Sequence, residues 1–146
     1  MTSQPVNGPL HGLKVVEMGQ LIAGPFCGQL LGDMGAEVIK LEAPGVGDPM
    51  RHWGQGETPT WWRVIARNKY SVAVDLRAAQ GQQTARDLIA QADILIENFR
   101  PGTLEKWGLA PADLTEANPR LIVVRVSGYG QTGPYSSRAG FGGIGE

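Results

Sequence analysis

The sequence has 146 residues, enough for one compact domain with a buried core. Thirteen Lys and Arg side chains stand against fourteen Asp and Glu, and this net charge of -1 lacks the basic surface of a nucleic-acid-binding or membrane-surface protein. A single cysteine, Cys27, excludes an internal disulfide framework, and we find neither a signal peptide nor the roughly 18 consecutive apolar residues of a membrane span. We therefore expect a soluble, cytoplasmic protein with no nucleic-acid or membrane partner.

The first part of the chain predicts a β-α-β unit. Leu13–Met18 is short, apolar and rich in β-branched residues, as is typical of a buried parallel strand. A helix follows, with Pro25 in its first turn and Gly35 directly after its end. Glu37–Leu41 is the second strand, which we expect to lie parallel to the first after a right-handed crossover.

Residues Pro44–Thr60 predict a long loop, because they contain four Gly and three Pro residues together with Asp48. Loops of this length in compact domains usually bind a ligand or are mobile. We expect Trp53, Trp61 and Trp62 to anchor it.

Strand and helix patterns alternate after this loop. The predicted strands are Ser71–Asp75, Asp93–Glu97 and Leu121–Ser127, and the predicted helices are residues 78–92, a short helix after Pro101, and Pro111–Ala117. Such alternation predicts an α/β fold, a Rossmann-like, doubly wound, mostly parallel sheet of roughly five strands. The final segment, Gly128–Glu146, is rich in turn residues, so we expect the sheet to be incomplete at the C-terminus.

Ligands of doubly wound sheets bind beyond the carboxyl ends of the strands, which directs attention to the segments that follow each strand. Gly19–Pro25 is neither a G-x-G-x-x-G motif nor a P-loop, which disfavours a nicotinamide dehydrogenase. Asn98–Gly102 places an amide, an aromatic ring and a cation beside a helix N-terminus, which suits a base stacked near phosphates. Alternatively, this is an ordinary turn in which Asn98 caps the helix and Phe99 packs inward.

Gly24, Gly28 and Gly32 form a stripe without side chains along the first helix. Interior glycines destabilise a helix by about 0.5–1 kcal/mol each relative to alanine, so a close contact must offset the loss. Tight helix packing is the favoured contact, and a bound ligand is the alternative. Cys27 in the same helix is expected to be a small core residue rather than a nucleophile, and neither histidine has partners at metal-ligand spacing.

Taken together, the segments LKVVEMGQLIAGPFCGQLLGDMGAEVIKLEAPGVGD, NKYSVAVDLR, ADILIENFRPGTLEKWGL and NPRLIVVRVSGYGQTGPYSSRAGF closely resemble the N-terminal region of the family III coenzyme A transferases, which include formyl-CoA transferase and the CaiB/BaiF enzymes. The resemblance covers nearly the whole chain from Pro9 onward. It implies that residues 1–12 are an N-terminal extension. Residues 13–146 would then be the N-terminal part of a coenzyme A-binding large domain, without the small domain, of an interlocked homodimer.

The implied activity is acyl-CoA transfer between small carboxylic acids, with coenzyme A or acyl-CoA as substrate and without a metal. In this family an aspartate attacks the thioester, forming a mixed anhydride and then an enzyme thioester. The resemblance places that aspartate beyond Glu146, so we expect no catalytic residue here and an inactive chain on its own.

Coenzyme A contacts implied by the resemblance fall on Gln20, Leu21, Ile22, Ala23, Val74, Arg77, Asn98, Phe99, Lys106 and Arg138. The cations in this set would bind the phosphates, the first loop would line the pantetheine path, and Asn98 and Phe99 would bracket the adenine side. Formyl-CoA transferase has a basic residue where this chain has Ala43, so we expect the adenine end to be held differently.

Two other functions remain open. The first is an α-methylacyl-CoA racemase-like isomerase, which would need a base to abstract a proton from the α-carbon. Phe141 and Gly142 stand where those racemases have a catalytic histidine and aspartate, which disfavours this function. The second is a non-catalytic nucleotide-binding module that uses the fold without chemistry.

Overall fold

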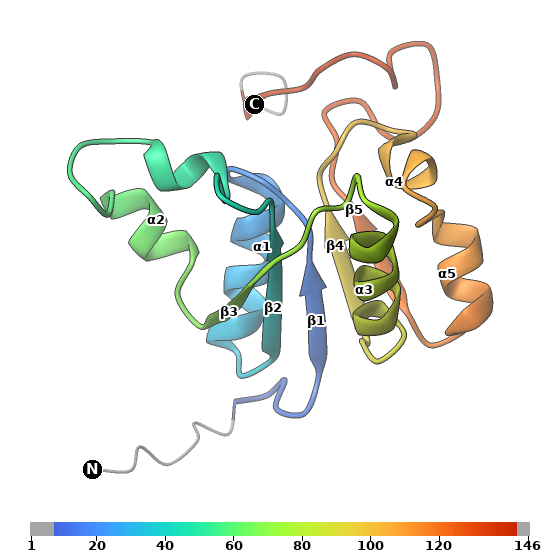
Figure 1. Cartoon of the computed structure of the whole chain (residues 1–146), viewed down its shortest axis with the longest axis horizontal. Coiled ribbons are helices and arrows are strands. Elements are labelled where there is room, and N and C mark those ends of the chain that lie inside the picture. Colours follow the sequence, from blue (N-terminus) through green and yellow to red (C-terminus); the bar gives the residue numbers. More distant parts are fainter. Residues whose placement is uncertain (1–7, 143–146) are drawn as a thin grey trace.

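The structure, a computed structural model, describes residues 8–142 and contains a five-stranded sheet with helices on both faces (Figure 1). The strands are β1 (Lys14–Glu17), β2 (Glu37–Glu42), β3 (Lys69–Ala73), β4 (Ile94–Glu97) and β5 (Ile122–Arg125). The helices are α1 (Ala23–Asp33), η1 (Pro49–His52, a 3-10 helix), α2 (Thr60–Ile65), α3 (Ala79–Ile89), α4 (Thr103–Lys106) and α5 (Pro111–Ala117). All neighbouring strands are parallel in the order β3-β2-β1-β4-β5, which confirms the predicted Rossmann-like fold.

Apolar side chains on the two faces of the sheet form two separate cores, because successive residues of a strand point to opposite faces. Val15 packs beneath α1 with Val38 and Ile96. Val16 belongs to a larger cluster that joins the sheet to α3, α4 and α5. Each fully buried aliphatic side chain contributes about 1.5–3 kcal/mol, so these two cores hold the helices on the sheet.

The third strand begins earlier than its sequence predicts. We expected Ser71–Asp75, whereas β3 pairs with β2 from Lys69 to Ala73. The strand was predicted from its apolar residues, and a charged residue such as Lys69 does not fit that pattern. In the structure Lys69 nevertheless belongs to the strand, because its ammonium group lies inside the protein, 2.6 Å from Glu17.

The long loop contains the short helix η1 and leads into α2, and two of its tryptophans do not anchor it. Trp53 and Trp61 are 50% and 58% exposed, so the expectation is wrong for both. Trp62 lies 4.0 Å from the guanidinium of Arg51. The buried apolar contact of the loop is Met50, which is 1% exposed.

The segment after β5 is a loop whose ends touch. A Cβ atom added to Gly128 would lie 2.6 Å from the Cα of Gly140, so the backbones meet where neither residue has a side chain. Within the loop, the Arg138 guanidinium lies 4.2 Å from the ring of Tyr135. The loop therefore leaves the sheet and returns to the same place.

Candidate functional site

Asn98 joins the segment after β4 to the loop between β1 and α1. Its side-chain oxygen accepts a hydrogen bond from the Gln20 N–H at 2.7 Å, and its amide nitrogen donates to the Gln20 carbonyl at 2.9 Å. This close approach requires that Gly19 and Gly24 have no side chain, because a Cβ there would lie only 2.9 or 3.2 Å from the same Asn98 oxygen. The structure thus brings two of the predicted site residues together. Asn98 does not cap the following helix, whose N-cap is Gly102.

Beneath this loop lies a buried ion cluster made of Glu17, Lys40, Asp48 and Lys69. The Lys40 ammonium is 2.7 Å from Glu17 and 2.8 Å from Asp48, and the Lys69 ammonium is 2.6 Å from the second oxygen of Glu17. None of these side chains is more than 2% exposed. The two positive and two negative groups compensate one another, as buried charges must. Burial lowers the pKa of Lys69, although Glu17 acts in the opposite direction.

One glycine of the α1 stripe, Gly28, packs directly on this cluster. A Cβ on Gly28 would lie 2.5 Å from a carboxylate oxygen of Glu17, and one on Gly32 would lie 3.0 Å from the carbonyl of Asn68. Tight packing therefore explains these two glycines, and the contact of Gly28 is with a charged group. Cys27 packs against the apolar core, where burial raises the pKa of its thiol and so disfavours the reactive thiolate.

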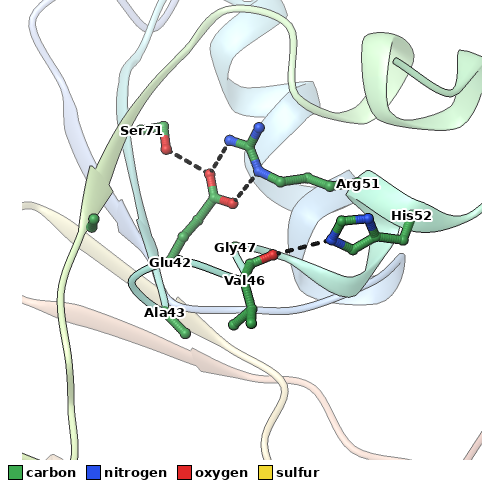
Figure 2. A pocket seen from close by; sticks show the side chains of 9 residues that line it. Glu42, Ala43, Val46, Gly47, Arg51, His52 and Ser71 are labelled. Atoms are coloured by element: carbon green, nitrogen blue, oxygen red, sulfur yellow. Dashed lines mark hydrogen bonds and ion pairs between the residues drawn. The ribbon is translucent and has the colours of Figure 1, made fainter. Parts of the chain in front are cut away.

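A hollow of about 310 Å³ lies at the carboxyl ends of β2 and β3 (Figure 2). It is lined by Glu42, Ala43, Gly45, Val46, Gly47, Arg51, His52, Ser71 and Ala73. The Arg51 guanidinium donates hydrogen bonds of 2.7 and 2.8 Å to the two carboxylate oxygens of Glu42, and the Ser71 hydroxyl donates another at 2.6 Å. Burial opposes ionisation of Glu42, but the bonds from Arg51, Ser71 and the Asp48 N–H outweigh it and lower its pKa to about 2. No motif or spacing in the sequence groups these residues.

Another buried carboxylate organises the carboxyl ends of β4 and β5. Glu97 is fully buried, and it accepts from the Arg125 guanidinium and from the Phe99 N–H, both at 2.7 Å. The Phe99 ring packs edge-on against Trp107, 5.0 Å between centroids, and against the larger core. Phe99 therefore points inward, as the alternative interpretation of this turn expects.

The remaining predicted contact residues lie apart from this framework. Arg77, in the turn before α3, Lys106, at the end of α4, and Arg138 are exposed and have no ion-pair partner within residues 8–142. Val74 is 6% exposed and belongs to the core. The N-terminus of α1, with Ile22 at its N-cap, carries no side-chain cap for its first backbone N–H groups. Free cations and uncapped N–H groups at one edge of a sheet suit an anionic ligand.

Residues 8–142 offer neither a cluster of metal ligands nor a membrane-spanning helix. No group of three or more His, Cys, Asp or Glu side chains in residues 8–142 is arranged to hold a metal ion. No helix in the same range is long and apolar enough to cross a membrane.

Comparisons with known proteins agree on one family. The profile of CoA-transferase family III matches residues 10–146. A succinyl-CoA–D-citramalate CoA-transferase of Chloroflexus aurantiacus is 57% identical over 100% of this chain, which spans 37% of that relative. Human succinyl-CoA:glutarate CoA-transferase is 43% identical over 91% of this chain and 32% of its own length.

A solved structure of a CaiB/BaiF family protein from Brucella suis superposes with a TM-score of 0.88 at 43% identity, covering 94% of this chain and 38% of that one. The chain therefore spans about a third of the length of these proteins, between 32% and 38%. With a profile match over nearly its whole length, the chain belongs to CoA-transferase family III.

Proposed function

We propose that this protein, at its full natural length, moves coenzyme A from succinyl-CoA to a short dicarboxylic acid. The observation that carries the proposal is the 57% identity, over the whole chain, to a succinyl-CoA–D-citramalate CoA-transferase. The human relative also takes succinyl-CoA, by its name, with glutarate as its second acid. Citramalate and glutarate both carry two carboxyl groups, so the acceptor proposed here is a dicarboxylate.

The coenzyme A crevice in this proposal lies at the switch point of the sheet. In the order β3-β2-β1-β4-β5, the chain reverses its direction of winding between β1 and β4, where nucleotide ligands of such folds bind. Gln20 follows β1 and Asn98 follows β4, and their hydrogen bonds span this point. The pantetheine arm would run along Gln20, Leu21, Ile22 and Ala23.

The nucleotide end of coenzyme A would lie over β2 and β3. Its phosphates would meet the exposed cation of Arg77, which follows β3, and those of Lys106 and Arg138, which lie on the side of β4 and β5. The hollow beside Ala43 offers room for the adenine group, with the Arg51–Glu42 pair as its polar wall (Figure 2). Asn98 contributes by holding Gln20, and Phe99 by packing behind that turn, rather than by bracketing the base.

The chemistry would take place on an aspartate outside this chain. Its carboxylate attacks the succinyl-CoA carbonyl carbon, and the coenzyme A thiolate leaves as a mixed anhydride forms. The thiolate then attacks the aspartyl carbonyl of the anhydride and releases succinate, which leaves an enzyme thioester. The acceptor carboxylate and the thiolate repeat the two steps in reverse order. This chain would bind and orient coenzyme A and be inactive alone, within a cytoplasmic interlocked homodimer.

The test is a transfer assay on the full-length protein. Succinyl-CoA is mixed with D-citramalate, L-malate or glutarate, and the coenzyme A esters are separated by chromatography. We expect one new dicarboxyl-CoA ester together with free succinate, and mass spectrometry should detect coenzyme A covalently attached to the protein. Binding of coenzyme A without any transfer would instead favour the non-catalytic module. Loss of deuterium from a 2-methylacyl-CoA would favour the isomerase, for which Phe141, 74% exposed, offers no base.

A further inference from the structure

Asp48 connects segments of the chain that are distant in sequence. One of its oxygens accepts from the Leu21 N–H at 3.0 Å and from the Met50 N–H at 2.8 Å. The other lies 2.8 Å from the Lys40 ammonium. Its own N–H donates to Glu42 at 2.8 Å. A carboxylate that is 2% exposed thus ties the loop after β1 to the wall of the hollow at β2 and β3.

The loop that Asp48 holds has an unfavourable backbone. Leu21 has φ +61, a left-handed conformation that side chains other than glycine rarely adopt. Such a conformation persists only where the surrounding structure imposes it. Here three side chains from other segments of the chain restrain the loop. Asp48 accepts from the Leu21 N–H, and Lys40 donates to the Gly19 carbonyl at 2.8 Å. Asn98 bonds both the N–H and the carbonyl of Gln20.

We infer that Asp48 is a positioning residue for coenzyme A, which keeps Leu21 in its left-handed conformation and so presents the loop from Gln20 to Ala23 ready to bind. The inference rests on the proposed function, because it assigns this loop to the pantetheine path. Asp48 is too deeply buried to contact the ligand and acts only through the loop. Without it, the loop would have to be driven into the strained conformation by the ligand itself, and affinity would fall.

The test compares coenzyme A binding by calorimetry in the full-length protein and its variants. Asp48→Ala should weaken binding about tenfold, since a left-handed residue costs roughly 1–2 kcal/mol and 1.4 kcal/mol is tenfold in affinity. Leu21→Gly in the same background should recover about threefold or more of the loss, because glycine adopts φ +61 without strain. A purely structural role for Asp48 gives no such recovery.

Asp33 provides the matched control. Its carboxylate also pairs with a cation, here Arg67, and accepts from Asn68 at 2.7 Å, but it lies at the opposite end of α1 from the loop. Asp33→Ala should lower the melting temperature and leave coenzyme A affinity within about twofold of wild type, as expected of a pair remote from the site. If Asp48→Ala does not fold, Asp48→Asn replaces it, since its NH2 group is a donor, and the amide oxygen can keep the Leu21 N–H only by turning this donor toward the Lys40 ammonium.

A second readout separates this inference from the proposed function. This readout is hydrogen exchange of the Leu21 amide, which needs no ligand and can be followed by mass spectrometry or NMR. Because exchange follows local opening, its rate should rise at least tenfold in the Asp48 variant and stay unchanged in the Asp33 variant. If wild type fails to bind coenzyme A, the proposed function is wrong, and the exchange data alone decide the role of Asp48. Unchanged exchange, or equal affinities of Asp48→Ala with and without Leu21→Gly, overturns the inference.

Discussion

Adding one methyl group at Gly28 should destabilise the protein, although alanine is the better helix former. The new Cβ would lie 2.5 Å from a carboxylate oxygen of Glu17, well inside van der Waals contact. Glu17 cannot withdraw freely, because Lys40 and Lys69 hold its two oxygens at 2.7 and 2.6 Å. The methyl must therefore push α1 away from the sheet or pull the carboxylate off an ammonium group.

The magnitude follows from opposing contributions. Overpacking of a core costs about 1–3 kcal/mol, and disturbing a buried ion pair adds to this, since complete loss of one partner costs about 3–5 kcal/mol. Replacing glycine by alanine within a helix returns about 0.5–1 kcal/mol. We expect Gly28→Ala to lose about 2 kcal/mol of unfolding free energy, or about 4–8 °C in melting temperature for a domain of this size.

Urea unfolding followed by circular dichroism measures this loss. An exposed position of α3 calibrates the helix contribution, because Gln80→Ala and Gln80→Gly should differ by about 0.5–1 kcal/mol in favour of alanine. In a Glu17→Asp background, where the carboxylate is one methylene shorter, the Gly28→Ala penalty should shrink. If Gly28→Ala is as stable as wild type or more so, the ion cluster does not limit the approach of α1, and this reasoning is refuted.

Three further predictions concern the site. Glu42→Gln should lower the free energy of unfolding by about 3 kcal/mol at neutral pH, because the pKa of Glu42 is about 2 in the folded protein against an ordinary 4.5. Urea titrations at several pH values should show that this advantage of wild type is complete above pH 4.5 and disappears as the pH falls toward 2. Asn98→Asp removes the donor to the Gln20 carbonyl and should weaken coenzyme A binding about tenfold by calorimetry; equal affinity would separate this contact from the site. Arg77→Ala should weaken the same binding about tenfold to a hundredfold, whereas Arg120→Ala, an exposed arginine remote from the strands' carboxyl ends, should not change it; unchanged affinity of Arg77→Ala would remove this residue from the phosphate contacts.

Most of the fold could be predicted from local sequence. Runs such as LKVVEM and LIVVRVS are apolar and β-branched, and the glycine and proline positions around α1 mark its ends. In the structure Pro25 lies in the first turn of α1, and Gly35 follows its end with φ +98. The start of β3 could not be predicted, because Lys69 is stabilised by a carboxylate on another strand that no local pattern reveals.

Only part of the candidate site could be predicted from the sequence. The rule that ligands bind beyond the carboxyl ends of parallel strands brought Gln20 and Asn98 together, and the structure joins them. The ion cluster was missed because pairing between distant charges leaves no periodic signal. One sign was present: Glu17 and Lys40 are charged residues in strands expected to be buried on both faces, and each needed a partner.

The contact between Gly128 and Gly140 has a consequence for how this enzyme family can diversify. A loop whose two ends meet is anchored at a single point, so changes in the length or composition of residues 129–139 need not be transmitted to β5. Such a segment is free to change its side chains while the sheet beneath it stays the same. The two glycines at the base of the loop cannot be replaced in the same way, because any side chain there would push its two ends apart.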